Sequence, residues 1–207
     1  MHQQILVFIY DESRVLQEYS ERMREMGIQL LRRISKSLGH EECYIEKKMK
    51  LESGYNILGP NFYQSLSRCS DDKNQIGQFP HQDPVLLVLI AQNVGGGLQI
   101  KHQGKWLNAD FSTSSIGVLV ADNIEILTNG KYKSLLHRVA LNTTVERLSL
   151  PFFFEPSLDA TVKPEPKFVD DRNPPSYRQM TYKEYLESNS QYHVIEAKAN
   201  LINEALL

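Results

Sequence analysis

The sequence has few cysteines, no long apolar run and no marked excess of charge of either sign. Cys43 and Cys69 are its only cysteines. One disulfide between them is conceivable, but two reduced thiols in a cytoplasmic protein fit this usage better. The apolar runs are far shorter than the roughly 20 residues that a membrane helix needs. The net charge of −2 without blocks of like charge argues against nucleic acid or a membrane as a partner.

The composition that remains is ordinary for a globular domain, with 41% hydrophobic and 23% charged residues among 207. This length is enough for one domain with a substantial core. Residues 5–10 are apolar but have neither a basic stretch before them nor a small-residue cleavage site after them. We therefore expect a strand or a packed lead-in there, not a signal peptide.

Residues 11–38 have the pattern of one amphipathic helix. Asp11 or Ser13 can cap its start, and Gly39 can close its end. The helix should cover the strands that follow it in the chain, because its apolar stripe needs a surface to pack against. Apolar residues recur at steps of three and four along it: Val15, Leu16, Tyr19, Met23, Met26, Leu30, Leu31, Ile34 and Leu38.

From residue 55 onward the sequence consists of short segments rich in Val, Ile, Leu, Phe and Tyr, separated by turn sequences. Gly104 can take the positive φ of a tight hairpin. Strands at this spacing, with one long helix, predict a sandwich or jelly roll, mostly β with supporting helices. A Pro-rich loop over 162–180 and a short helix over 181–191, capped by Thr181 and Glu184, should follow. The predicted strands lie within 55–63, 84–92, 98–108, 115–122, 133–141 and 147–156.

A histidine and a carboxylate, His81 and Asp83, stand directly before the apolar run 85–91. Alternate residues of a strand point to the same face, so these two side chains would lie side by side. His137, in the predicted strand 133–141, offers a third ligand. Two histidines and one carboxylate leave open positions on an octahedral metal, as in non-haem Fe(II) oxygenases, whereas zinc more usually takes a tetrahedral site. Hydrogen-bonded structural histidines remain the alternative.

Arg147 and Ser149 are a second pair that should share one strand face. A guanidinium supplies a planar fork for a carboxylate, and a serine hydroxyl adds another donor to the same anion. An arginine buried beside the apolar run 150–154 would be unfavourable without an anionic partner. That partner is either an Asp or Glu of the chain or a small dicarboxylate whose other end chelates the metal.

The order of these motifs, HxD at 81–83, H at 137 and RxS at 147–149, resembles the 2-oxoglutarate and Fe(II)-dependent dioxygenases. Within that superfamily the sequence is similar to the plant-type, isopenicillin N synthase-like branch. "NFY" at 61–63 resembles the branch's NxY element, and "VGGGLQIKHQGKWLNA" at 94–109 its glycine-rich hairpin. "NIEILTNGKYKSLLHRV" at 123–139 follows another of its patterns almost residue for residue. The resemblance runs from roughly Leu16 to Tyr185.

The resemblance implies a double-stranded β-helix (jelly roll) oxygenase core over 55–160, a helical support segment over 1–54 and a C-terminal loop and helix over 161–207. It implies Fe(II) as the metal, 2-oxoglutarate as the cosubstrate, ascorbate as a further candidate cofactor, and O2 and a small organic metabolite as reactants. The metabolite, of specialised or hormone type, would be hydroxylated or desaturated. Implied roles fall on metal ligands His81, Asp83 and His137 and on cosubstrate-holding residues Arg147, Ser149, Tyr63 and Asn61.

The sequence also departs from the branch. Members usually carry a further amino-terminal region, which predicts a short or truncated member with an incompletely enclosed pocket. Gln82 stands where Thr or Ser is common between the ligands, and Ala121 where Gly is usual. Two alternatives therefore stay open: an oxidase of the same fold that does not consume 2-oxoglutarate, and a catalytically silent fragment that acts as an interaction protein.

Overall fold

The computed structural model describes residues 12–65, 75–94 and 96–190. The predicted lead-in over 5–10, the Asp11 cap and Cys69 lie outside these ranges. Cys43 is a free, half-buried thiol. In the described part of the chain, no helix has both the length and the apolar character needed to cross a bilayer. The cytoplasmic location stays a prediction.

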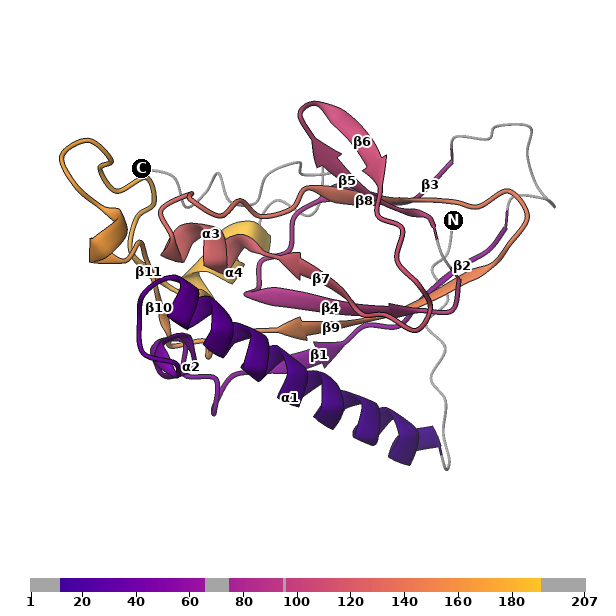
Figure 1. Cartoon of the computed structure of the whole chain (residues 1–207), viewed down its shortest axis with the longest axis horizontal. Coiled ribbons are helices and arrows are strands. Elements are labelled where there is room, and N and C mark those ends of the chain that lie inside the picture. Colours follow the sequence, from indigo (N-terminus) through magenta and orange to yellow (C-terminus); the bar gives the residue numbers. More distant parts are fainter. Residues whose placement is uncertain (1–11, 66–74, 95, 191–207) are drawn as a thin grey trace.

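Two antiparallel sheets face each other and form the predicted jelly roll, with few helices around it (Figure 1). Strand β9 (Arg147–Phe154) is central in the first sheet, which also contains β1 (Asn56–Leu58), β2 (Asn61–Tyr63), β4 (Leu87–Gln92) and β7 (Gly117–Val120). The second sheet has the order β3 (Ile76–His81), β8 (His137–Ala140), β5 (Leu98–His102) and β6 (Lys105–Asn108). The predicted fold class is confirmed.

Helix α1 (Glu12–Ser37) lies along the outer face of the first sheet (Figure 1). Its buried seam runs through Met23, Gly27 and Leu31, and a Cβ on Gly27 would lie 1.9 Å from the Phe154 ring. Only glycine therefore lets the helix approach β9 this closely. The predicted stripe is wrong at two positions, since Val15 is 68% and Met26 40% exposed.

Helix α1 ends at its C-terminus as the sequence predicts, with Gly39 closing it. Gly39 has φ +74, and its N–H donates to the carbonyl of Lys36 while that of His40 donates to Ser35. These two bonds satisfy carbonyls that a helix end leaves open. The hairpin between β5 and β6 is confirmed as well, with positive φ at Gln103 (+48) and Gly104 (+79).

Two segments that carry the functional side chains differ from the predicted strands. Strand β3 extends over residues 76–80, where no strand is expected, and ends at His81. Helix α3 (Asp122–Leu127) begins at the last residue of the predicted strand 115–122, and no helix is expected there. All the residues of α3 are buried, so the helix has no polar face to reveal its period. Short helix α2 (Tyr44–Lys48) was not expected either.

The C-terminal part is more ordered than the predicted extended loop. Strands β10 (Thr161–Val162) and β11 (Met180–Thr181) pair across it, and η2 (Pro166–Phe168) forms a turn of 3-10 helix. Helix α4 (Tyr182–Ser190) has the predicted capping box. The Thr181 N–H donates to Glu184 at 2.7 Å, and the Glu184 N–H donates to the Thr181 hydroxyl at 3.2 Å.

Strand β3 is an edge strand with an irregular register against β8. Gln78 pairs with Val139, and His81 pairs with His137. Three steps along β3 thus match two along β8, so one extra residue bulges out between Gln78 and His81. Pro80 is tolerated there, because a bulge on an edge strand needs no ladder N–H.

Candidate metal centre

The three predicted metal ligands converge at one end of the space between the sheets. His81 is the last residue of β3, His137 is the first of β8, and the two are cross-strand neighbours. Asp83 lies in the loop before β4, so the expectation that it shares a strand face with His81 is wrong. The loop is held instead by backbone, because the N–H of Asp122 donates to the Asp83 carbonyl at 3.0 Å.

The ligand atoms of the triad face one another. Asp83 Oδ1 lies 3.7 Å from His81 Nε2, and Asp83 Oδ2 lies 3.5 Å from His137 Nε2. One candidate ligand atom from each residue lies within 4.8 Å of the others. Asp83 is 8% and His137 5% exposed, while the His81 side chain is 25% exposed. The open side of the triad is therefore next to His81.

Backbone carbonyls fix which nitrogen of each imidazole carries the proton. His81 Nδ1 lies 2.8 Å from the Phe79 carbonyl, and His137 Nδ1 lies 2.8 Å from that of Leu135. A carbonyl only accepts, so each Nδ1 is the donor and each Nε2 keeps its lone pair toward the triad. Burial lowers the pKa of His137 below its usual value, which also favours the neutral ring that a metal requires.

The predicted cosubstrate anchor lies at the other end, on adjacent strands. In the register of β2 against β9, Asn61 pairs with Ser149 and Tyr63 with Arg147. The guanidinium carbon of Arg147 lies 5.3 Å from the centre of the Tyr63 ring, and Nη1 donates to the Ser149 hydroxyl at 3.3 Å. These residues therefore form one cluster, as the sequence predicts.

Arg147 is 4% exposed, and no carboxylate among the described residues forms an ion pair with its guanidinium. Its hydrogen-bond acceptors there are the hydroxyl of Ser149 and the amide oxygen of Gln92, which lies 3.2 Å from Nε and 3.0 Å from Nη2. The predicted alternative of an internal salt bridge is therefore wrong for this part of the chain. Burial lowers the pKa of Arg147, and a buried cation without a counter-charge is unfavourable.

Gln92 is a functional residue that the sequence reasoning missed. Its Oε1 accepts two bonds from Arg147 and its Nε2 donates to the Phe111 carbonyl at 3.1 Å, so its amide orients the guanidinium. The signal available in the sequence was a single polar residue at the end of an apolar strand. Gly97 allows the same packing, because a Cβ there would lie 3.2 Å from Arg147 Cδ.

Triad and anchor line one cavity. All of the predicted site residues are among its lining residues, together with Gln78. The apolar part of the wall includes Val88, Ile90 and Leu98. A cation at one end, a metal-binding triad at the other and apolar walls between them suit a small anion that bridges the two ends.

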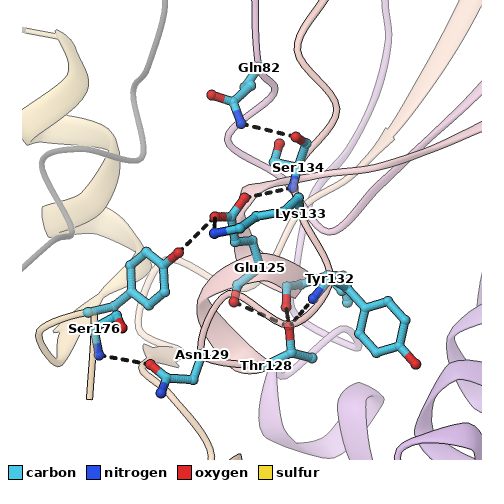
Figure 2. A network of polar contacts seen from close by, with 10 residues as sticks. Gln82, Glu125, Thr128, Asn129, Tyr132, Lys133, Ser134 and Ser176 are labelled. Carbon is cyan, nitrogen blue, oxygen red and sulfur yellow. Dashed lines mark hydrogen bonds and ion pairs between the residues drawn. The ribbon is translucent and has the colours of Figure 1, made fainter. Parts of the chain in front are cut away.

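A polar network braces the two segments that carry the triad (Figure 2). Gln82 Nε2 donates to the Ser134 carbonyl at 3.2 Å, which ties the loop after β3 to the segment before β8. Glu125 of α3 accepts from the Ser134 N–H at 2.7 Å, from Lys133 at 2.9 Å and from the Tyr177 hydroxyl at 2.7 Å. We call these five residues the brace.

The brace continues into the turn after α3 (Figure 2). The Thr128 hydroxyl donates to the Ile124 carbonyl at 2.8 Å, and Asn129 accepts from the Ser176 N–H at 2.8 Å. Asn129 has φ +51, which ends the helix as the turn sequence at 128–131 indicates. The C-terminal segment is thereby fastened to the helix whose first residue, Asp122, holds the ligand loop.

Asp122 is a fully buried carboxyl group behind the triad. It accepts a hydrogen bond from the Tyr185 hydroxyl at 2.7 Å. Burial raises the pKa of Asp122 to about 7, although this hydrogen bond works in the opposite direction.

The residues present fit Fe(II) and a dicarboxylate. Imidazole and carboxylate donors with an open face suit non-haem iron, and both Nε2 lone pairs are directed at the Asp83 carboxylate. The buried guanidinium offers planar donors to a carboxylate at the far end of the same cavity. Ascorbate stays a prediction.

Comparison with known proteins agrees with this geometry. Residues 56–156 match the 2OG-Fe(II) oxygenase superfamily. The chain is 35% identical over 182 residues to 2-oxoglutarate-dependent dioxygenase 19 of Oryza sativa subsp. japonica, a match that covers 88% of this chain and 53% of the relative. It is 31% identical over 170 residues to flavonol synthase/flavanone 3-hydroxylase of Petunia hybrida, covering 82% of the chain and 48% of the relative.

A solved structure shares the fold over nearly the whole chain. It is described as JOX2 in complex with 2OG, Fe and JA, and it superimposes with a TM-score of 0.82 at 27% identity. The match covers 98% of this chain and 59% of that one. The chain thus spans about half the length of the curated relatives that it matches. Residues 56–156, just under half of the chain, thus match the 2OG-Fe(II) oxygenase superfamily, and the fold agrees with that match.

Proposed function

We propose that the protein is a 2-oxoglutarate-dependent oxygenase that hydroxylates or desaturates a small organic metabolite of specialised or hormone type. In this proposal Fe(II) binds at His81, Asp83 and His137. The far carboxylate of 2-oxoglutarate binds at Arg147, Ser149 and Tyr63, and Asn61 lies beside them. The partners are the metabolite and O2, without nucleic acid or a membrane.

The observation that supports the proposal most strongly is the shared cavity. Residues from a loop and from strands of both sheets line it, and each end has the chemistry of one half of a chelating dicarboxylate complex. The buried Arg147, which has no described counter-charge, supports an anionic ligand independently of the triad. The relatives' names support a small organic substrate.

The chain's own residues would position and protect the reactants. Bound Fe(II), with 2-oxoglutarate, would supply the activation of O2. His81 and His137 present fixed lone pairs, and Asp83 supplies the negative charge that retains a dication. Tyr63, whose pKa burial raises, stays protonated as a hydroxyl donor at the anchor. Val88, Ile90 and Leu98 limit water in the space between.

The decisive experiment is anaerobic titration of the Fe(II)-loaded protein with 2-oxoglutarate, followed by visible absorption. We expect a metal-to-ligand charge-transfer band that saturates at one equivalent. Absence of the band would contradict the proposal and would favour a silent fold. Exposure to O2 with candidate metabolites then tests succinate release. Metabolite oxidation without succinate would instead identify an oxidase that does not consume 2-oxoglutarate.

A further inference from the structure

Gln78 lies between the two ends of the cavity and belongs to none of the motifs that predict the site. Its side chain lines the cavity from β3. The Tyr63 hydroxyl donates to its Oε1 at 3.2 Å, and its Nε2 lies 3.3 Å from His81 Nε2. One carboxamide therefore touches both an anchor residue and a metal ligand.

The bulge in β3 creates this placement. Residues three apart on a regular strand point to opposite faces. The extra residue between Gln78 and His81 restores the parity, because these two positions pair with Val139 and His137, which are two apart. Gln78 and His81 therefore both face the cavity, whereas Phe79 within the bulge is 65% exposed.

The direction of each hydrogen bond is fixed by its neighbours. The Phe79 carbonyl takes the Nδ1 proton of His81, so His81 Nε2 can only accept, and Gln78 Nε2 is the donor. The lone pair that accepts this bond is the one that would ligate the metal. Once a metal uses it, the Gln78 N–H needs another acceptor.

That acceptor is defined by distance. Donor atoms in neighbouring positions around a metal with bonds of about 2.1 Å lie roughly 3 Å apart. Gln78 Nε2 lies 3.3 Å from His81 Nε2, so it would come within hydrogen-bond reach of an atom bound next to His81 on the side that faces Gln78. The other hydrogen-bond partner of the Gln78 amide is the Tyr63 hydroxyl, and the Tyr63 ring contacts the guanidinium of Arg147.

We propose that Gln78 is a third contact for 2-oxoglutarate, donating its amide N–H to an oxygen of the 2-oxo acid between the anchor and the metal. This inference rests on the proposed function. Gln78 would then select for a cosubstrate that carries an oxygen acceptor beside the metal, in addition to the far carboxylate that Arg147 recognises. Gln78 is a binding residue in this role, and it performs no proton transfer.

The test compares Q78L and Q78E with wild type and with Q99L. Gln99 is a matched control, because it lies on β5 of the same sheet and both ends of its amide are paired, with Asn108 and Arg138, but it does not line the cavity. Mn(II) affinity is measured by electron paramagnetic resonance without cosubstrate. 2-Oxoglutarate affinity of the Fe(II) form is measured anaerobically from the charge-transfer band, and thermal unfolding is measured in parallel.

We expect Q78L to weaken 2-oxoglutarate binding about 10-fold, as loss of a hydrogen bond to a charged group would, and to leave Mn(II) affinity within about twofold. Q78E should bind Mn(II) more tightly and 2-oxoglutarate more weakly than Q78L, because its carboxylate attracts the metal and repels the cosubstrate. Q99L should match wild type in both affinities.

Unchanged 2-oxoglutarate affinity in Q78L would overturn the inference. An equal loss of both affinities, accompanied by a lower melting temperature, would overturn it as well, because it would show a structural role. Failure of the wild type to bind Fe(II) or 2-oxoglutarate would instead contradict the proposed function itself.

Discussion

The two ends of the cavity are built in different ways. At the anchor end, Arg147 and Ser149 are alternate residues of β9, and the register of β2 sets Tyr63 and Asn61 opposite them. At the triad end, the side chains come from a strand end, a loop and the start of another strand, and a bulge aims one of them. Local sheet geometry thus specifies the anchor, whereas the triad depends on the brace and on backbone bonds from α3.

Because of this difference, the two ends of the cavity should tolerate substitutions to different degrees. The anchor should keep its shape when the triad is changed, because its residues are neighbours within one sheet. The triad should be sensitive to substitutions some distance from it, since α3 and the C-terminal segment hold its loop. Substitutions at the two ends should therefore move different measurable quantities.

The largest effect is expected from D83A at the triad end. Loss of the carboxylate should weaken Mn(II) binding by more than about a thousandfold, since loss of even a ligand's hydrogen-bond partner costs about 10- to 100-fold. H102A is a matched control, because His102 is exposed on the β5–β6 hairpin. Equal metal affinity of D83A and H102A would contradict the proposed metal site.

The pH dependence of stability should reveal the carboxyl group behind the triad. Asp122 has a folded pKa of about 7 and an unfolded pKa of about 3.9. The folded state therefore holds the proton more tightly, and Asp122 reduces stability progressively as pH rises from about 4 to 7. In chemical unfolding, D122N should gain up to about 4 kcal/mol relative to wild type across this window and no more above it. A constant difference at all pH values would show that Asp122 is not protonated in the fold.

R147M tests the anchor end alone. Removal of the guanidinium should weaken 2-oxoglutarate binding about 100-fold with Mn(II) affinity nearly unchanged, because hydrogen bonds to charged groups are each worth about 1.5–3 kcal/mol. Without ligand, the melting temperature should not fall, since a buried cation that lacks a described counter-charge is replaced by an apolar side chain. A melting temperature that falls sharply would indicate that the fold itself needs the cation.

The smallest effect is expected from Q82L in the brace. It removes one hydrogen bond, to the Ser134 carbonyl, and also an amide oxygen that has no hydrogen-bond partner among the described residues. Stability should change by less than about 1 kcal/mol, and Mn(II) affinity should fall about 10-fold because the two ligand-bearing segments separate more easily. Metal affinity equal to that of wild type would limit the brace to a structural role.

The sequence predicts the anchor better than the elements around the triad. Arg147 and Ser149 follow the two-residue period of one strand, and that period survives folding. The structure brings His81, Asp83 and His137 together, but the shared strand face expected for His81 and Asp83 is wrong, because Asp83 is in a loop. Strand β3 is hard to recognise because Gly77 and Pro80 lower its strand propensity.

The supporting polar residues could not be predicted, because their roles depend on contacts between distant segments. Gln92 meets Arg147 only when β4 and β9 pair, and Glu125 meets Tyr177 only when the C-terminal segment packs on α3. Helix α3 is buried on every side, so hydrophobic periodicity cannot distinguish it from a strand. The close packing of α1 at Gly27 likewise depends on the Phe154 ring of another segment.

The additional residue between Gln78 and His81 also has a genetic consequence. An in-frame loss of one codon at Phe79 or Pro80 would leave Gln78 and His81 two residues apart, so regular pairing with β8 between these positions would keep both side chains on the cavity face. Such a deletion would leave the sheets and the arginine intact. A deletion of one codon in this segment would therefore reduce the local twist of the edge strand without changing the face on which the Gln78 amide lies.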